Sequence, residues 1–228
     1  MIADKVSHGY VSAVTRLFCS HLCVNARYIP DVLLHADAAI ASAVEYGFLT
    51  LFPSMMIQRG WALVQVGSVE EGFDQINRGM ATHPVWMLRY CRLRADACLR
   101  AKRAEEGLHA LGEGLQMLEG GGRHSEEPEL HRLKGELLLM QNAAAREEAE
   151  ICFREAIEIA HDQQAKSWEL RATISLSRVL RDSGRSDEAR RMLGEIYNWF
   201  TEGFDTADLK EAKALLDELG PNALQLRH

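Results

Sequence analysis

The stretch RGWALVQVGSVEEGFDQINRG, Arg59 to Gly79, contains the pattern that decides the fold. A small residue, Gly60, lies in an apolar helical segment, and Gly67 then interrupts the chain. Ser68 and Glu71 form an S-x-x-E capping box, which is typical of a helix start. The second helix carries Gly72, Ile76 and Gly79 on one side. The stretch therefore predicts two helices that approach closely through small side chains.

The same frame, a small residue followed by a spaced triplet, recurs at intervals of roughly forty residues. The small residues are Ser20, Gly60, Ala95, Gly135 and Ser177, and the triplets that follow them begin at Val32, Gly72, Gly107, Ala149 and Ala189. One helical hairpin cannot bury its apolar stripe alone, but stacked neighbours can bury it together. The sequence therefore predicts a stack of about five hairpins.

These offsets of small, glycine and alanine positions resemble the tetratricopeptide repeat. The resemblance implies an all-α fold, a right-handed superhelix of about five helical hairpins with a C-terminal capping helix. We expect one helical-repeat domain over residues 1–228, with hairpins at 10–46, 53–82, 86–119, 127–162 and 167–200 and the capping helix at 206–219. The capping helix has an apolar stripe at Leu209, Ala212 and Leu216, which must lie against an earlier helix.

Four segments resemble the C-terminal tails of one bacterial group of signalling proteins. They are RGWALVQVGSVEEGFDQI, ELHRLKGELLL, AEICFREAIEIAHDQQAKSWELRATISLSRVLRDSGR and IYNWFTEGFDTADLKEAKALLDEL, within roughly Gln58 to Leu219. Proteins of that group carry a class III adenylate or guanylate cyclase domain, or a transcription-factor domain, then a STAND ATPase, then a tetratricopeptide tail. The resemblance implies a bacterial signal-transduction module that corresponds to the tail alone.

Motifs for catalysis and for metal binding are missing from the sequence. It has no G-x-x-x-x-G-K-[ST] loop to hold ATP phosphates and no paired aspartates in a strand context for a cyclase metal site. The run CSHLC, Cys19 to Cys23, offers two thiols and His21, but a zinc site needs four ligands. We therefore expect no enzyme activity, no metal and no cofactor.

Composition limits the partners and the compartment. The formal charge of −7 disfavours nucleic acid and anionic membranes as general partners. No apolar run reaches membrane-spanning length, and the N-terminus lacks the order of a secretion signal. Five cysteines without framework spacing are typical of reduced thiols, so we expect a cytoplasmic protein.

Seven arginines are expected on the inner face, which the first helix of each pair lines in this repeat class. They are Arg89, Arg92, Arg100, Arg132, Arg171, Arg178 and Arg181. Guanidinium groups suit carboxylates and phosphates, so one hypothesis is a groove for an acidic peptide or an anionic small molecule. The alternative is that Asp96, Glu129, Glu136 and Asp182 neutralise these arginines in internal pairs. Trp61 and the Tyr90–Arg92 region are either an aromatic anchor for the partner or part of the core.

Three functions remain open from the sequence. The first is a non-catalytic regulatory module that binds a protein or peptide in its groove and biases an attached ATPase. The second is a small-molecule sensor with a partly apolar pocket around Trp61, Leu99 and Leu139. The third is self-association into a homo-oligomer through an exposed apolar end at Met1 to Pro53.

Overall fold

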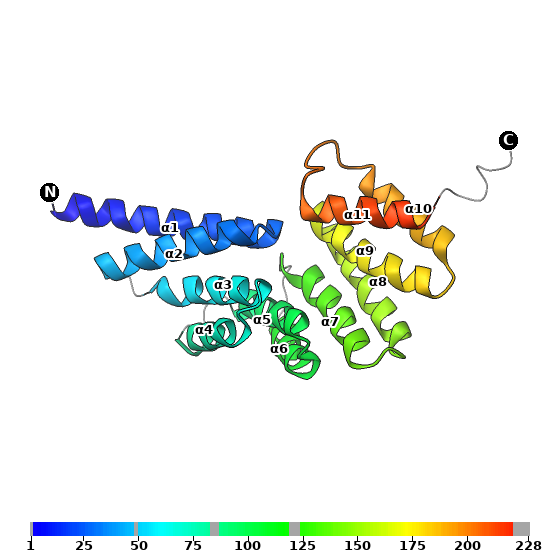
Figure 1. Cartoon of the computed structure of the whole chain (residues 1–228), viewed down its shortest axis with the longest axis horizontal. Coiled ribbons are helices and arrows are strands. Elements are labelled where there is room, and N and C mark those ends of the chain that lie inside the picture. The colour runs from blue at the N-terminus through cyan, green and yellow to red at the C-terminus, as the bar shows by residue number, and fades with distance from the viewer. Residues whose placement is uncertain (1, 48–49, 83–86, 119–123, 221–228) are drawn as a thin grey trace. The chain divides into compact units, whose positions relative to one another are not determined.

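A computed structural model describes residues 2–47, 50–82, 87–118 and 124–220, and within these ranges every regular element is an α-helix (Figure 1). The helices are α1 Ile2–Ala26, α2 Ile29–Tyr46, α3 Phe52–Gln65, α4 Val69–Thr82, α5 Met87–Ala101, α6 Ala104–Gln116, α7 Glu127–Gln141, α8 Arg146–Asp162, α9 Lys166–Asp182, α10 Ser186–Tyr197 and α11 Ala207–Glu218. The predicted all-α fold, with paired helices and a last single helix, is confirmed.

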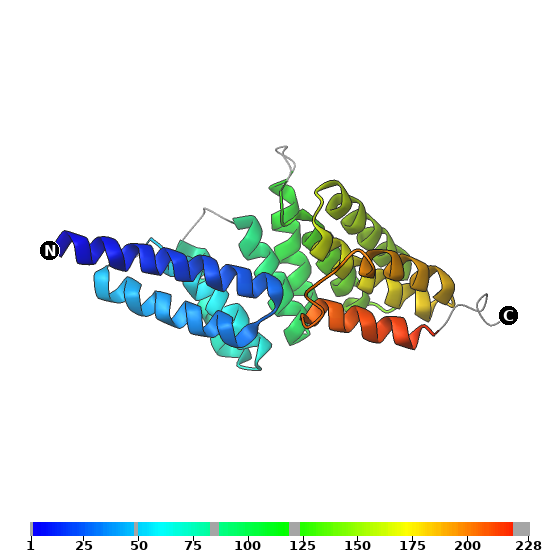
Figure 2. The ribbon, with the colours of Figure 1, turned by 90° about the horizontal axis from the view of Figure 1, so that it is seen from above.

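The chain divides into two compact units, Met1–Ala110 and Leu111–His228, with the division inside α6. In unit 1, α1 packs on α2, α3 packs on α4, and α2 contacts α3. Figures 1 and 2 both show α1 and α2 running side by side. In unit 2, α7 packs on α8, α8 on α9 and α9 on α10. Each unit is therefore a stack of tetratricopeptide-like hairpins, and a single domain over residues 1–228 stays a prediction.

The α3–α4 hairpin depends on two glycines that face each other. A Cβ atom at Gly60 would lie 2.5 Å from the carbonyl oxygen of Gly72, and a Cβ at Gly72 would lie 2.6 Å from the carbonyl oxygen of Gly60. Real Cβ atoms do not approach backbone oxygens so closely, so neither position has room for a methyl group. The two helices are thus in backbone contact at the point where the sequence predicted a close approach.

Unit 2 repeats this seam with different side chains. A Cβ at Gly135 would lie 2.6 Å from the ring of Phe153, and the Ser177 hydroxyl donates to the carbonyl oxygen of Ala189 over 3.4 Å. The predicted triplet residues in this unit are buried, namely Ala149, Phe153, Ala156, Ala189, Leu193 and Ile196. The small residue of each first helix therefore lies against the buried stripe of the second.

The helices α1, α3, α5, α8 and α9 end in one type of turn. A residue with positive φ follows the helix at Arg27, Gly67, Lys102, Gln164 and Gly184. The next N–H then donates to the carbonyl five residues earlier, as Ser68 does to Leu63 over 2.9 Å and Arg185 to Leu180 over 2.8 Å. This is the Schellman pattern, which satisfies carbonyls at a helix end. Glu71, predicted to take part in a capping box, accepts hydrogen bonds from Arg59 and Gln75.

The last helix closes unit 2. α11 contacts both α9 and α10, and it buries Leu209, Ala212 and Leu215. These side chains join a cluster that includes Leu170 and Leu193. The apolar face of α11 is therefore covered by the preceding hairpin, which is the role that the sequence predicted for a capping helix.

Candidate partner-binding site

Unit 1 contains a pocket of about 230 Å³ between α1, α3 and α5. These are the first helices of three successive hairpins. The lining residues are Tyr10, Val14, Leu17, Phe18, His21, Thr50, Leu51, Ser54, Gln58, Arg89 and Tyr90. In this unit the first helices thus form a hollow.

One face of α1 supplies the apolar wall. Tyr10, Val14, Leu17 and His21 are spaced by four, three and four positions, which places them on one side of a helix. Phe18 lies beside Leu17 and is 54% exposed, so it forms part of the rim. This wall offers dispersion contacts and apolar burial to a ligand, with few charges to orient it.

Two hydroxyl groups on the opposite wall satisfy each other. Ser54 on α3 and Tyr90 on α5 form a short hydrogen bond, and both residues are buried. Burial raises the pKa of the Tyr90 phenol, while the hydrogen bond from Ser54 and the charge of Arg89 act in the opposite direction. The phenol is therefore protonated at neutral pH, and the pair is a neutral part of the wall.

Gln58 is a polar lining residue with a buried acceptor atom. Its side chain lies one helical turn after Ser54 on α3 and is 3% exposed. Within the part of the chain that the structure describes, its Oε1 atom is buried and has no hydrogen-bond partner. A buried acceptor without a donor is costly, by about 1–3 kcal/mol. The pocket wall therefore holds an acceptor that a ligand could satisfy.

Three of the seven predicted groove arginines lie on α5, and one of them lines the pocket. Arg89 contributes its partly buried side chain to the lining. Arg92 is 2% exposed and donates from Nη2 to the Asn25 oxygen over 3.1 Å. Arg100 is exposed, and its Nε donates to the Gln65 carbonyl over 3.4 Å. The structure therefore brings Arg89 to the pocket and directs Arg92 and Arg100 to neighbouring helices.

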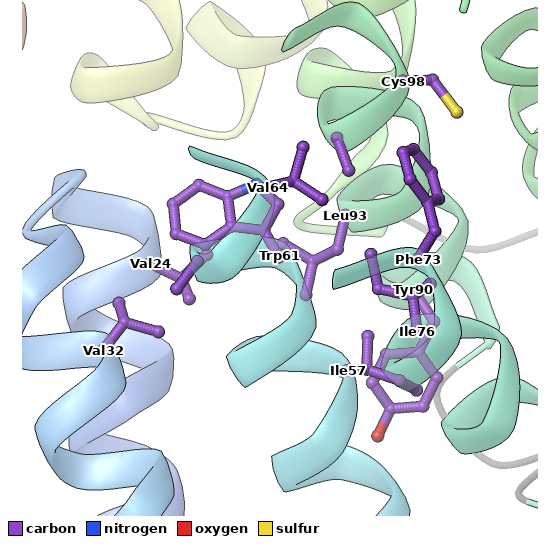
Figure 3. Close-up of a cluster of buried hydrophobic side chains, with 12 residues drawn as sticks. Val24, Val32, Ile57, Trp61, Val64, Phe73, Ile76, Tyr90, Leu93 and Cys98 are labelled. Carbon is purple, nitrogen blue, oxygen red and sulfur yellow. The ribbon is translucent and has the colours of Figure 1, made fainter. Parts of the chain in front are cut away.

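Trp61 lies in the core of unit 1. Figure 3 shows its indole beside Val24 and Val64 within a buried cluster. Its Nε1 donates to Asp96 Oδ2 over 2.5 Å. Asp96, which the sequence offered as a partner for arginine, thus binds the indole. This geometry agrees with the alternative that Trp61 is part of the core. A role of Trp61 in partner binding stays a prediction.

The four arginines of unit 2 form ion pairs. Arg132 binds Glu129 through two hydrogen bonds of 2.8 and 2.7 Å and lies 3.4 Å from Glu136. Arg171 pairs with Asp208 of α11, and Arg178 pairs with Glu211 over 2.7 Å. Arg181 pairs with Asp182 over 3.0 Å and with Glu218 over 2.7 Å. These ion pairs correspond to the alternative in which acidic residues of the chain neutralise the arginines. The pairs of Arg171, Arg178 and Arg181 with residues of α11 join α9 to that helix.

Sequence reasoning anticipated Arg89 and Tyr90 and missed most of the other lining residues. The α1 wall belongs to the copy of the repeat with the weakest pattern, and Gln58 looks like an ordinary polar helix residue. The spacing of Tyr10, Val14 and Leu17 was a usable signal of an apolar face. Burial of Gln58 had no signal, because it depends on how three hairpins stack.

Residues 2–47, 50–82, 87–118 and 124–220 also contain histidine, cysteine and acidic side chains outside the pocket. Among those residues, no group of three or more His, Cys, Asp or Glu side chains is arranged to hold a metal ion. No helix within them is long and apolar enough to cross a membrane. Within the described residues, none of the cysteines forms a disulfide, namely Cys19, Cys23, Cys91, Cys98 and Cys152.

Comparisons with known proteins found a similar structure and no sequence family. No family model matches the sequence, and no curated protein matches it. A solved structure similar to this chain is MamA MSR-1 C2, with 15% sequence identity and a TM-score of 0.46. The similarity covers 86% of this chain and 98% of that chain.

Proposed function

We propose that this chain is a non-catalytic protein-interaction module that binds a segment of a partner protein in the pocket between α1, α3 and α5. The observation that supports this most strongly is the lining of one hollow by the first helices of three successive hairpins. An extended or helical segment laid against such a surface contacts several helices at once. The hollow is mostly apolar with a few polar groups, which is typical of binding sites.

Charge at the pocket favours a segment with a carboxylate. Arg89 is the arginine of the lining, and a guanidinium binds carboxylates well even in a chain whose formal charge is −7. The arginines of unit 2 are engaged with their own glutamates and aspartates, so they support the packing of α9. Of the seven predicted arginines, Arg89 is the one that lines this pocket, so we propose the acidic-partner interaction for its neighbourhood.

The regulatory part of the proposal comes from the sequence resemblance. As a tail linked to a cyclase, regulator or STAND ATPase in the cytoplasm, this module would bias its attached domain through differential binding of the partner. An ATPase assay tests this regulatory part. ATP hydrolysis by a STAND ATPase joined to this chain should change when a peptide that binds the pocket is added, and an unchanged rate would contradict the linkage.

A peptide-display selection tests the binding function. Peptides selected on the wild-type chain should bind the variant Val14→Trp at least tenfold more weakly, because a large side chain at Val14 fills the pocket. The control is Ile151→Trp on α8, which adds the same indole at an exposed position in the other unit. Circular dichroism establishes that both variants fold. Failure to select any peptide, or equal binding by the Val14→Trp variant, would overturn the proposal.

Self-association through α1 and α2 is a second candidate function. Large apolar side chains are more than half exposed at Val11, Phe18, Leu22, Leu34 and Val44. Several exposed large apolar side chains on one hairpin can mark an interaction site, and a second copy of the chain would present the same side chains in return. Light scattering should show a mass that rises with concentration and falls to the monomer in Leu22→Glu. A wild-type chain that stays monomeric at every concentration would exclude self-association.

A further inference from the structure

The pocket has the size of one aromatic ring system. Benzene fits an apolar cavity of about 150 Å³ in a folded protein. Indole has half as many ring atoms again as benzene, so a pocket of about 230 Å³ is close to the space that one indole requires. Pockets that hold drug-sized ligands are about 300–1,000 Å³, so this pocket lies below that range.

The α3 wall of the pocket offers an acceptor to a hydrogen-bond donor of the ligand. The hydroxyls of Ser54 and Tyr90 bind each other, so they have little need of a ligand. Gln58 Oε1, on the α3 wall, is a buried acceptor that has no donor among the residues the structure describes. The terminal torsion of a glutamine is soft, so its amide can turn toward a ligand at little cost. A largely apolar group with one N–H therefore matches the α1 and α3 walls, while Arg89 lies in the lining beside them.

We propose that the pocket anchors a single tryptophan side chain of the partner segment, with the indole N–H donating to Gln58 Oε1. This inference rests on the proposed function and specifies its recognition. Phenylalanine would bury the acceptor without a donor, and tyrosine would supply a donor on a smaller ring. Tryptophan combines a large apolar area with one donor and is enriched among residues that dominate binding energy at interfaces.

Indole and 1-methylindole are the probes of this proposal, because the methyl group replaces the N–H. Binding to the full chain is measured by NMR line broadening or by competition with a selected peptide. We expect the wild-type chain to bind indole about tenfold more tightly than 1-methylindole, the effect of one buried hydrogen bond. The variant Gln58→Met keeps the volume and removes the acceptor, so it should bind the two probes about equally.

A matched variant separates the pocket from a general effect of glutamine substitution. Gln75 on α4 also has a buried Oε1 without a partner in the described residues, and it does not line the pocket. Gln75→Met should therefore keep the wild-type preference for indole. Equal binding of the two probes by the wild-type chain, or an unchanged preference in Gln58→Met, would overturn the proposal.

The outcomes distinguish this inference from the proposed function. Selected peptides that lack tryptophan but still depend on Val14 would overturn the tryptophan anchor and leave the interaction module in place. Selective indole binding without any selected peptide would support the chemistry of the pocket and overturn the protein partner. Selected peptides that share one tryptophan, and lose affinity when it becomes phenylalanine, would support both.

Discussion

Arg171 and Asp208 form a buried ion pair that joins α9 to α11. The Nε atom of Arg171 donates to both carboxylate oxygens of Asp208 over 3.2 Å, and Nη2 donates to Oδ2 as well. Arg171 Nη1 also lies 3.5 Å from Glu129 on α7. One guanidinium therefore connects three helices of unit 2, and its charge is balanced by two carboxylates away from solvent.

Removing the aspartate charge should destabilise the protein. In Asp208→Ala the guanidinium of Arg171 loses its bidentate partner while it stays buried, so we expect a loss of about 3–5 kcal/mol in the free energy of unfolding. Urea denaturation followed by circular dichroism measures it. The control is Asp217→Ala, which breaks the exposed pair with Lys213 and should cost about 0–1 kcal/mol. Similar losses in the two variants would contradict the structural role of Arg171.

The glycine seam of unit 1 should not tolerate alanine. Gly60→Ala places a methyl group against the carbonyl oxygen of Gly72, and we expect a loss of about 1–3 kcal/mol in stability. Gly194 is also helical, but a Cβ there would meet nothing within 4 Å. Gly194→Ala should therefore stabilise the protein by about 0.5–1 kcal/mol through helix propensity. Thermal unfolding should show a lower melting temperature than wild type for Gly60→Ala and a higher one for Gly194→Ala.

The spacing of small residues predicted the helical pairs because close packing of two helices limits side-chain size at a fixed period. Gly60, Gly72, Gly135 and Ser177 all lie at the seams, where their size determines how near the backbones come. The turns were harder to predict. Gly67 and Gly184 mark two of them, but Arg27, Lys102 and Gln164 adopt the same positive φ without a glycine. There the stacked helices impose the turn on residues that do not favour it.

The candidate site was less predictable than the fold for the same physical reason. A repeat pattern identifies the face that packs within a hairpin, and the pocket is formed between hairpins. Arg89 and Arg171 are both arginines on first helices, yet one lines a pocket and the other is paired with Asp208. That difference depends on an acidic residue 37 positions later in the chain, which no local pattern reports.

Burial of the Cys98 thiol should make stability depend on alkaline pH. Burial, with a smaller contribution from Glu106, raises the pKa of this thiol from 9.0 to about 11, although Arg94 and Arg103 lower it. Below pH 9 the folded and unfolded chains both keep the proton. Between pH 9 and about 11 only the unfolded chain loses it, so the stability contributed by the protonated thiol falls as pH rises.

The difference in unfolding free energy between the wild-type chain and Cys98→Ala isolates this effect from other titrating groups. We expect the difference to be constant from about pH 7 to 8.5 and to decrease by about 1.4 kcal/mol per pH unit above pH 9. Urea titrations at intervals of half a pH unit measure it. A difference that stays flat up to about pH 10.5 would show that the thiol has an ordinary pKa.

Replacing Gln58 with methionine should stabilise the protein when the pocket is empty. The substitution keeps the length of the side chain and removes a buried oxygen that has no donor within the described residues, so we expect a gain of about 1 kcal/mol in unfolding free energy. The control is Gln163→Met, which removes the hydrogen bond from Gln163 Nε2 to the His124 carbonyl and should cost about 1 kcal/mol. Urea denaturation shows whether the unfolding free energy of each variant is higher or lower than that of the wild-type chain. A loss of stability in Gln58→Met would mean that its amide is satisfied in solution, and the acceptor would then be less available to an indole.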